Sequence, residues 1–195
     1  MPISKARCVI NTLPLDVLER VFLTCVHWEH ALVSPLLLAK VCGHWRTVAT
    51  QSARLWTDID MSVPPKAKYF LHRSQGAGLN LTWCSPEIRK LGKSWRESFP
   101  WMCEHTDRLE SLNVHWFSAL DIATILSRLG DDLPRLSSLL LYASDPCGKF
   151  SLRFGGKVKV CMNMPHLRHL NLWYVASYSP CLSAMLTFLG GIQGI

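Results

Sequence analysis

The sequence has few charged residues and no long apolar run. Charged residues make up 18% of the 195 residues, and hydrophobic residues make up 49%. A chain of this composition can bury enough apolar surface to offset the entropy of ordering, which excludes an intrinsically disordered protein. No stretch reaches the roughly 18 apolar residues that a membrane-spanning helix requires, so we expect no membrane span. The N-terminus also lacks the apolar segment of a secretory signal, which predicts an intracellular protein, cytoplasmic or nuclear.

The sequence also lacks the motifs of metal sites and of common catalytic sites. Its eight cysteines include no C-x-x-C pair, and they are too sparse for a disulfide scaffold. Neither a G-x-S-x-G motif nor a complete phosphate-binding loop occurs. We therefore expect reduced cysteines, no bound metal, no cofactor and no catalytic residue in this chain.

The net charge of +7 is unevenly distributed. Residues 1–60 carry six Lys or Arg against five Asp or Glu, whereas residues 61–195 carry 15 against nine. In the segment 83–101, basic residues alternate with tryptophans, namely Trp83, Arg89, Lys90, Lys93, Trp95, Arg96 and Trp101. A solvated helix face is the commoner cause of such a pattern. The alternative that this segment is a basic binding module for nucleic acid or an acidic protein nevertheless stays open.

The first sixty residues predict three short helices. Apolar residues recur at helical spacing over residues 14–26, where Pro14 occupies the first turn and its missing N–H costs nothing. The dipeptide Ser34-Pro35 marks the start of a second helix, which Gly43 ends. A third helix is expected over residues 44–51.

The order of the apolar motifs in this region resembles an F-box. The motifs are, in order, Leu13-Pro14, Val17-Leu18, Val21-Phe22, the run over residues 36–42, Trp45-Arg46 and Leu55-Trp56. Composition alone favours a small helical subdomain packed on its own C-terminal neighbour, whereas the ordered set of motifs favours the F-box. One departure is the separation of 23 positions between Phe22 and Trp45, several more than in the compact motif. This departure leaves the contacts of the second helix open.

The resemblance implies a partner and an interface. F-box domains bind the Skp-family adaptor of cullin-type (SCF) ubiquitin ligases, so a Skp-family partner and, through it, a cullin are implied. The adaptor contacts implied by the resemblance are Leu13, Pro14, Val17, Leu18, Val21 and Phe22, with Trp45 either in the same interface or supporting it. Leu55 and Trp56 are implied to anchor the helices to the downstream domain. Apolar and aromatic anchors of this kind carry most of the binding energy of an interface.

The rest of the chain predicts alternating helices and strands. An alternating stretch over 54–59 begins a strand, a helix is expected over 66–74, and a strand over 79–83. Three later segments share the pattern Leu-x-x-Leu-x-(Leu/Val), and they begin at Leu109, Leu136 and Leu167. Their starts are 27 and 31 residues apart, with a helix expected over 118–129 and Gly130 as its stop.

This spacing is typical of a leucine-rich repeat solenoid. The Asn or Cys of a regular repeat is absent, because Phe117, Ser144 and Val175 occupy its place. A small α/β layer of parallel strands therefore remains the alternative.

We therefore expect an α+β chain in which a three-helix F-box is joined to a short, irregular α/β solenoid resembling leucine-rich repeats. The parts are an N-terminal arm over 1–10, the F-box over 11–60, a linker helix over 61–78 and the repeat domain over 79–195, which we expect to be incomplete. The combination resembles divergent fungal F-box proteins, whose repeat domain binds an unknown protein substrate. Because solenoid strands line a binding face, the candidate substrate contacts are Asn113, His115, Tyr142, Asn171 and Trp173.

Overall fold

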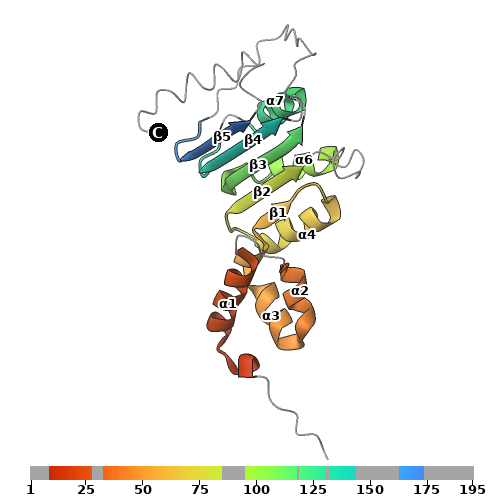
Figure 1. Ribbon diagram of the computed structural model, residues 1–195, viewed down its shortest axis with the longest axis vertical. Helices are drawn as coiled ribbons and strands as arrows, with labels where there is room; N and C mark the ends of the chain where they lie inside the picture. The colour runs from red at the N-terminus through yellow and green to blue at the C-terminus, as the bar shows by residue number, and fades with distance from the viewer. Residues whose placement is uncertain are drawn as a thin grey trace, which may run out of the picture. The chain divides into compact units, whose positions relative to one another are not determined.

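The computed structural model describes residues 9–27, 33–84, 95–117, 119–130, 132–143 and 163–173. These residues form a mixture of helices and parallel strands, which confirms the predicted α+β class (Figure 1). The chain divides into two compact units, Met1–Thr57 with Phe70–Ala77 and Asp58–Tyr69 with Gly78–Ile195. This division differs from the boundaries expected at residues 60 and 78. The segment 58–60 pairs with the sheet and so belongs to the second unit, and the helix expected over 66–74 is divided between the two units.

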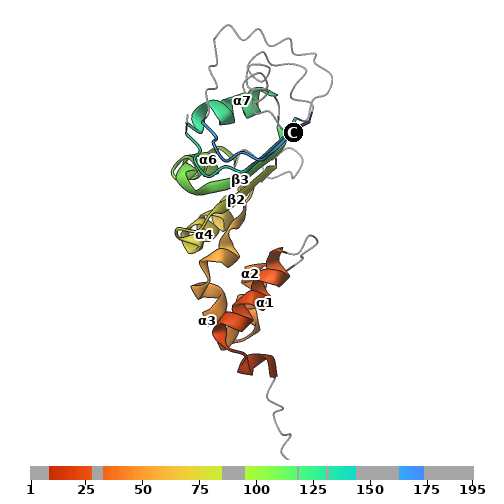
Figure 2. The same ribbon diagram turned by 90° about the vertical axis from the view of Figure 1, so that its left-hand side faces the viewer.

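The first unit contains three short α-helices and two turns of 3₁₀-helix. Their bounds are η1 Val9–Thr12, α1 Leu15–His27, α2 Pro35–Val41, α3 Gly43–Gln51 and η2 Ala53–Trp56. Figure 2 shows the three α-helices grouped together. The predicted start of α2 is confirmed, because Pro35 is its first residue and the Ser34 hydroxyl accepts the N–H of Leu36 at 3.4 Å. Helix α1 confirms the helix predicted over 14–26 to within one residue at either end.

The boundary between α2 and α3 lies one residue earlier than the sequence suggests. Cys42 adopts an extended backbone with φ −158° and ψ 174°, which separates the two helices. Gly43 is therefore the first residue of α3, and the prediction that it ends α2 is wrong. The Cys42 sulfur caps α3 by accepting the N–H of Trp45 at 3.5 Å.

The core of the first unit is built around two aromatic side chains. Phe22 of α1 and Trp56 of η2 are both fully buried. The Trp56 indole packs edge-on against Phe70 with ring centroids 5.1 Å apart, and its Nε1–H donates to the Ala49 carbonyl at 2.8 Å. Because a buried N–H without a partner is costly, this bond fixes the orientation of the indole.

The second unit is built on a five-stranded parallel sheet. Its strands lie in chain order, and they are β1 Asp58–Asp60, β2 Leu79–Cys84, β3 Leu109–Phe117, β4 Ser138–Ala143 and β5 His169–Trp173 (Figure 1). The helices between them are α4 Pro64–Ser74, α6 Trp95–Cys103, η3 Thr106–Arg108 and α7 Ala119–Arg128. The strand predicted over 79–83 and the helix over 118–129 are confirmed. Of the strand predicted over 54–59, only its last two residues enter β1, because 53–56 form η2.

The leucine spacing in the sequence corresponds to the register of the strands. Ser111 of β3 pairs with Ser138 of β4, which pairs with His169 of β5. These partners are 27 and 31 residues apart, like the starts of the repeated leucine pattern. Asp132 and Asn163, which precede the two Pro-containing turns, form a further parallel bridge. The repeated segments therefore lie side by side as equivalent pieces of one sheet.

The two faces of the sheet differ in burial. On β2, β3 and β4, alternate residues are buried in the core, including Leu81, Leu112, Val114, Leu139 and Leu141. Helix α7 packs against β3 and β4 through buried apolar side chains such as Ile122 and Ile125. The intervening strand residues are only half-buried, so they define a second face of the sheet. None of the helices in the described ranges is long and apolar enough to cross a membrane.

Candidate functional site

The first unit leaves large apolar side chains exposed on α1 and α2. On α1, Val17 and Val21 are 39% and 37% exposed, and they are four residues apart. On α2, Leu37 and Val41 are 52% and 59% exposed at the same spacing. Side chains at this spacing lie on one side of a helix, so each helix presents a short apolar stripe. Five of the seven large apolar side chains exposed in the described residues lie on these two helices.

The expected adaptor contacts are divided between this surface and the core. Leu18 and Phe22 are both 0% exposed, so in this structure they belong to the core of the first unit and offer no accessible surface. Trp45 is half-buried, with its ring 4.8 Å from that of Phe22 between centroids. The remaining expected contacts are accessible to differing degrees: Val17, Val21 and Pro14 are exposed, and Leu13 is half-buried.

Leu37 and Val41 belong to the same class of exposed side chains, but the sequence did not single them out. The signal was present, because α2 is apolar over most of its circumference. Because α3 packs against one side of this seven-residue helix, apolar side chains remain on another side of it.

The half-buried face of the sheet, which we call the open face, carries most of the expected substrate contacts. Its residues form rows across the strands because the sheet is parallel and in register. One row is Asp58, Asn80, Ser111, Ser138 and His169; the next is Asp60, Thr82, Asn113, Leu140 and Asn171. A third row contains Cys84, His115 and Tyr142, and the backbone of Trp173 pairs with that of Tyr142. The structure thus places Asn113, His115, Tyr142 and Asn171 in two adjacent rows.

A bulge in β3 adds a residue that the sequence did not indicate. Trp116 has a φ of +66°, and the register shifts between His115 and Phe117. The extra residue lets Phe117 point into the core, where it is 2% exposed and packs against Trp83. Trp116 itself stays 40% exposed, with its ring 4.3 Å from that of Tyr142 between centroids. β-Bulges commonly redirect a side chain in this way.

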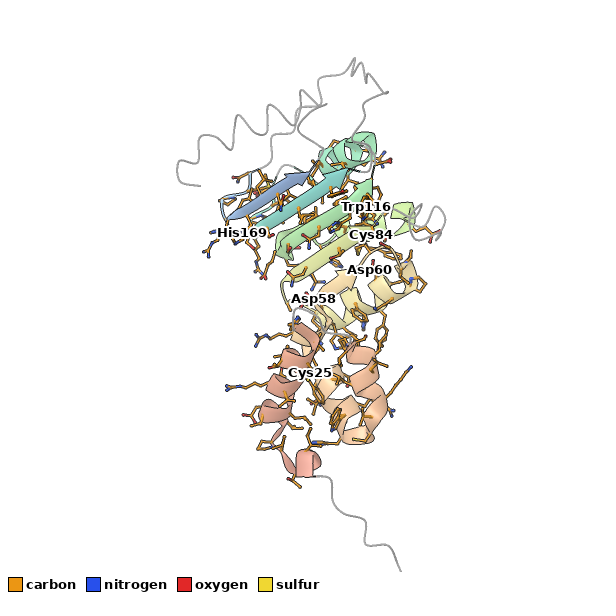
Figure 3. The ribbon with its side chains drawn as sticks, in the orientation of Figure 1. Cys25, Asp58, Asp60, Cys84, Trp116 and His169 are labelled. Atoms are coloured by element: carbon orange, nitrogen blue, oxygen red, sulfur yellow. The ribbon has the colours of Figure 1, made fainter. Side chains whose placement is uncertain are left out.

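The two carboxylates of the open face and its His115 have defined surroundings. Asp58 accepts a hydrogen bond from the Asn80 side chain at 2.7 Å, and Asp60 accepts the N–H of Ser62 at 3.0 Å. Partial burial lowers the pKa of His115 below its ordinary value, so this imidazole is predominantly neutral near pH 7. Figure 3 shows Asp60, Cys84 and Trp116 toward the carboxyl ends of their strands, with Asp58 and His169 at the opposite ends of theirs.

The segment considered for nucleic-acid binding has few accessible aromatic rings in its described part. Trp83 is fully buried and stacks on Phe99, with ring centroids 5.7 Å apart, so it cannot stack on a base. Trp101 is half-buried, and the Lys68 ammonium lies 5.9 Å from the centre of its ring. The basic residues Arg89, Lys90 and Lys93, and the side chains of Trp95 and Arg96, lie outside what the structure describes.

Metal-binding and thiol chemistry find little support in the described residues. Among them, no three His, Cys, Asp or Glu side chains are grouped closely enough to hold a metal ion. Burial raises the pKa of the Cys103 thiol, and the nearby Arg128 opposes this effect less strongly. The Cys103 thiol donates to the Arg128 carbonyl at 3.5 Å, so it is not activated as a nucleophile.

No protein-family model, curated protein or solved structure matches this chain.

Proposed function

We propose that this chain is a substrate-recruiting subunit of a cullin-type ubiquitin ligase. In this proposal α1, α2 and α3 form an F-box that binds a Skp-family adaptor. The repeated segments, each a strand followed by a helix, form a short solenoid resembling leucine-rich repeats. The open face of its sheet binds a protein substrate. Other subunits perform the ubiquitin transfer, and this chain raises the effective concentration of the substrate beside them.

The exposed stripes of α1 and α2 carry the proposal. Single exposed apolar side chains are ordinary on protein surfaces, whereas here two pairs recur at helical spacing, Val17 with Val21 and Leu37 with Val41. Full burial of such a side chain contributes about 1.5–3 kcal/mol, and because these four are 37–59% exposed, a partner can add roughly half of that for each. Two such stripes in one small helical unit are typical of a surface that a second polypeptide completes.

The open face supports the second half of the proposal. Its rows contain amide, hydroxyl and imidazole groups together with the exposed Trp116 ring. Side chains of this kind on a rigid sheet can form hydrogen bonds and aromatic contacts without reorganising the backbone. This arrangement suits recognition of another protein, and the described residues of this face do not resemble a catalytic arrangement.

Co-expression with a Skp-family adaptor tests the first half of the proposal. Size-exclusion chromatography should give a stoichiometric complex that persists at moderate salt, because the exposed anchors are apolar. Replacing Val17→Asp together with Val21→Asp should abolish the complex without unfolding the protein, since both side chains are already exposed. An adaptor complex that survives this double change would contradict the assigned interface.

A matched control separates the loss of the apolar stripe from the added charge. Thr47 and Gln51 are exposed on α3 and are also four residues apart. Thr47→Asp with Gln51→Asp introduces the same two charges into the same unit, and this variant should retain the adaptor complex. Binding that falls sharply with salt, or that requires nucleic acid, would favour a basic binding module instead.

A further inference from the structure

The open face of the sheet has a charge character opposite to that of the whole chain. The chain carries 21 Lys and Arg residues, yet none occupies a position in the three rows described above. The two residues with a formal charge in these rows are Asp58 and Asp60. His115, in the middle of the third row, is predominantly neutral because burial lowers its pKa.

The aromatic pair on β3 and β4 adds a second attraction for cations farther across this face. Trp116 and Tyr142 lie with ring centroids 4.3 Å apart and planes inclined at 58°, and the indole is 40% exposed. The face of an aromatic ring carries a partial negative charge and attracts Lys or Arg, with indole the strongest. The left-handed backbone of Trp116, at φ +66°, lowers the free energy of unfolding. The fold keeps this strain at a position where the indole is accessible to a partner.

We propose that the open face binds an extended basic peptide of the substrate, with one cationic residue near Asp58 and Asp60 and a second on the Trp116–Tyr142 pair. The inference rests on the proposed function only in treating this face as the substrate site. The asparagine, serine and threonine side chains between the two ends supply hydrogen bonds to the peptide backbone. These rows offer no Lys or Arg side chain that could pair with the carboxylates of an acidic peptide.

The width of the sheet sets the spacing of the two cations. The Trp116–Tyr142 pair lies two to three strand spacings from β1, about 10–14 Å at about 4.8 Å per spacing, and one row beyond Asp60, about 7 Å further along the strands. The diagonal between the two sites is therefore about 12–16 Å. An extended peptide advances about 3.3 Å per residue, so about four residues span this distance. Side chains four residues apart in an extended peptide also point to the same side, so both can face the sheet.

Fluorescence anisotropy of two labelled ten-residue peptides tests this inference on the full chain. The first peptide has two arginines four residues apart in a Gly/Ser sequence, and the second has glutamates at the same positions. The arginine peptide should bind at least about ten-fold more tightly than the glutamate peptide, and Trp116→Ala should weaken it about ten-fold. Asp58→Asn with Asp60→Asn, which preserves the shape of both side chains, should weaken the arginine peptide by a similar factor.

Two controls make the result specific to the open face. Tyr69 on α4 is 40% exposed, like Trp116, so Tyr69→Ala removes an equally exposed aromatic ring from another place and should leave binding unchanged. Glu104→Gln with Asp107→Asn removes two exposed carboxylates elsewhere and should also have little effect. Equal binding of the two peptides, or no binding of the arginine peptide at about 1 mM, overturns the inference.

The same variants distinguish this inference from the adaptor proposal. Trp116→Ala should lose the arginine peptide and keep the adaptor complex. Val17→Asp with Val21→Asp should lose the adaptor complex and keep the peptide. Failure of peptide binding with an intact adaptor complex therefore overturns only the inference about the open face, and the reverse result overturns only the adaptor interface.

Discussion

The rings of Phe22 on α1 and Trp45 on α3 lie 4.8 Å apart between centroids, at an angle of 55°. Phe22 is fully buried in this contact, and Trp45 is half-buried. The sequence assigned Phe22 to the adaptor interface and left Trp45 either in that interface or supporting it. The contact shows instead that Phe22 holds α1 against α3, while Val21, its neighbour in the sequence, is exposed on another side of the same helix.

This difference predicts opposite effects for two neighbouring substitutions. Phe22→Ala should lower the free energy of unfolding by about 3–5 kcal/mol, because it leaves a cavity in the core. Val21→Ala should lower it by no more than about 1 kcal/mol, because 37% of the side chain is already exposed, yet weaken the adaptor complex. Urea denaturation followed by adaptor capture at equal protein concentration measures both effects. An unfolding free energy of Phe22→Ala close to that of the unmodified chain would contradict the assigned core.

The hydrogen bond of the Trp56 indole gives a second prediction. Trp56→Phe keeps an aromatic ring against Phe70 but removes the donor that contacts the Ala49 carbonyl at 2.8 Å. The lost bond and the smaller ring together should lower the free energy of unfolding by about 1–3 kcal/mol. Thermal denaturation of the two proteins under the same conditions measures the change. An unchanged midpoint would show that this bond does not hold η2 in place.

The sequence predicted β2 to β5 better than β1, because two local signals support those four strands. Apolar and polar residues alternate along β2, along β5 and over residues 112–115 of β3, whereas β4 contains three successive leucines. The spacing of Leu109, Leu136 and Leu167 predicts which strands become neighbours. A one-residue slip would expose the whole apolar set of a strand, so the register follows from the pattern. The same argument places Asn113 and His115 on the less buried face.

The surface of α1 was harder to predict for a physical reason. Val17 and Val21 lie beside Leu18 and Phe22 around the helix, so the apolar residues cover a broad arc. The sequence defines this arc but not which part of it packs inside the chain, because the packing of α3 and η2 decides that. The bulge at Trp116 escaped prediction for a similar reason, since the buried environment of Phe117 decides which residue is displaced.

The titration of two half-buried imidazoles predicts a loss of stability at acidic pH. Burial lowers the pKa of His115 below 6.5, and burial followed by the charge of Arg108 lowers that of His105. Below pH 6.5 the unfolded chain therefore binds more protons than the folded chain. Any stability from these groups is fully present above pH 6.5 and is lost as the pH falls through the lowered values of the folded state.

Urea denaturation at about pH 7.5 and about pH 5.5 measures this effect. The free energy of unfolding should be lower at the acidic pH, and the decrease should be smaller in His115→Gln, which cannot take up the proton. The imidazole resonances of His115 in the folded protein should titrate below pH 6.5. A titration midpoint above this value would show that the imidazolium is favoured by the fold, and the predicted pH dependence would then have the opposite sign.

Two glycines separate backbone strain from side-chain crowding. Gly130 follows α7 with a φ of +89°, and Gly43 begins α3; a Cβ at either position would meet no atom within 4 Å. Gly130→Ala should therefore lower the free energy of unfolding through backbone strain alone, by about 1–2 kcal/mol. Gly43→Ala should be neutral or stabilising by up to about 1 kcal/mol, because alanine is the better helix former. Urea denaturation of both variants measures the difference, and equal stabilities would mean that the chain leaves α7 without needing the left-handed conformation.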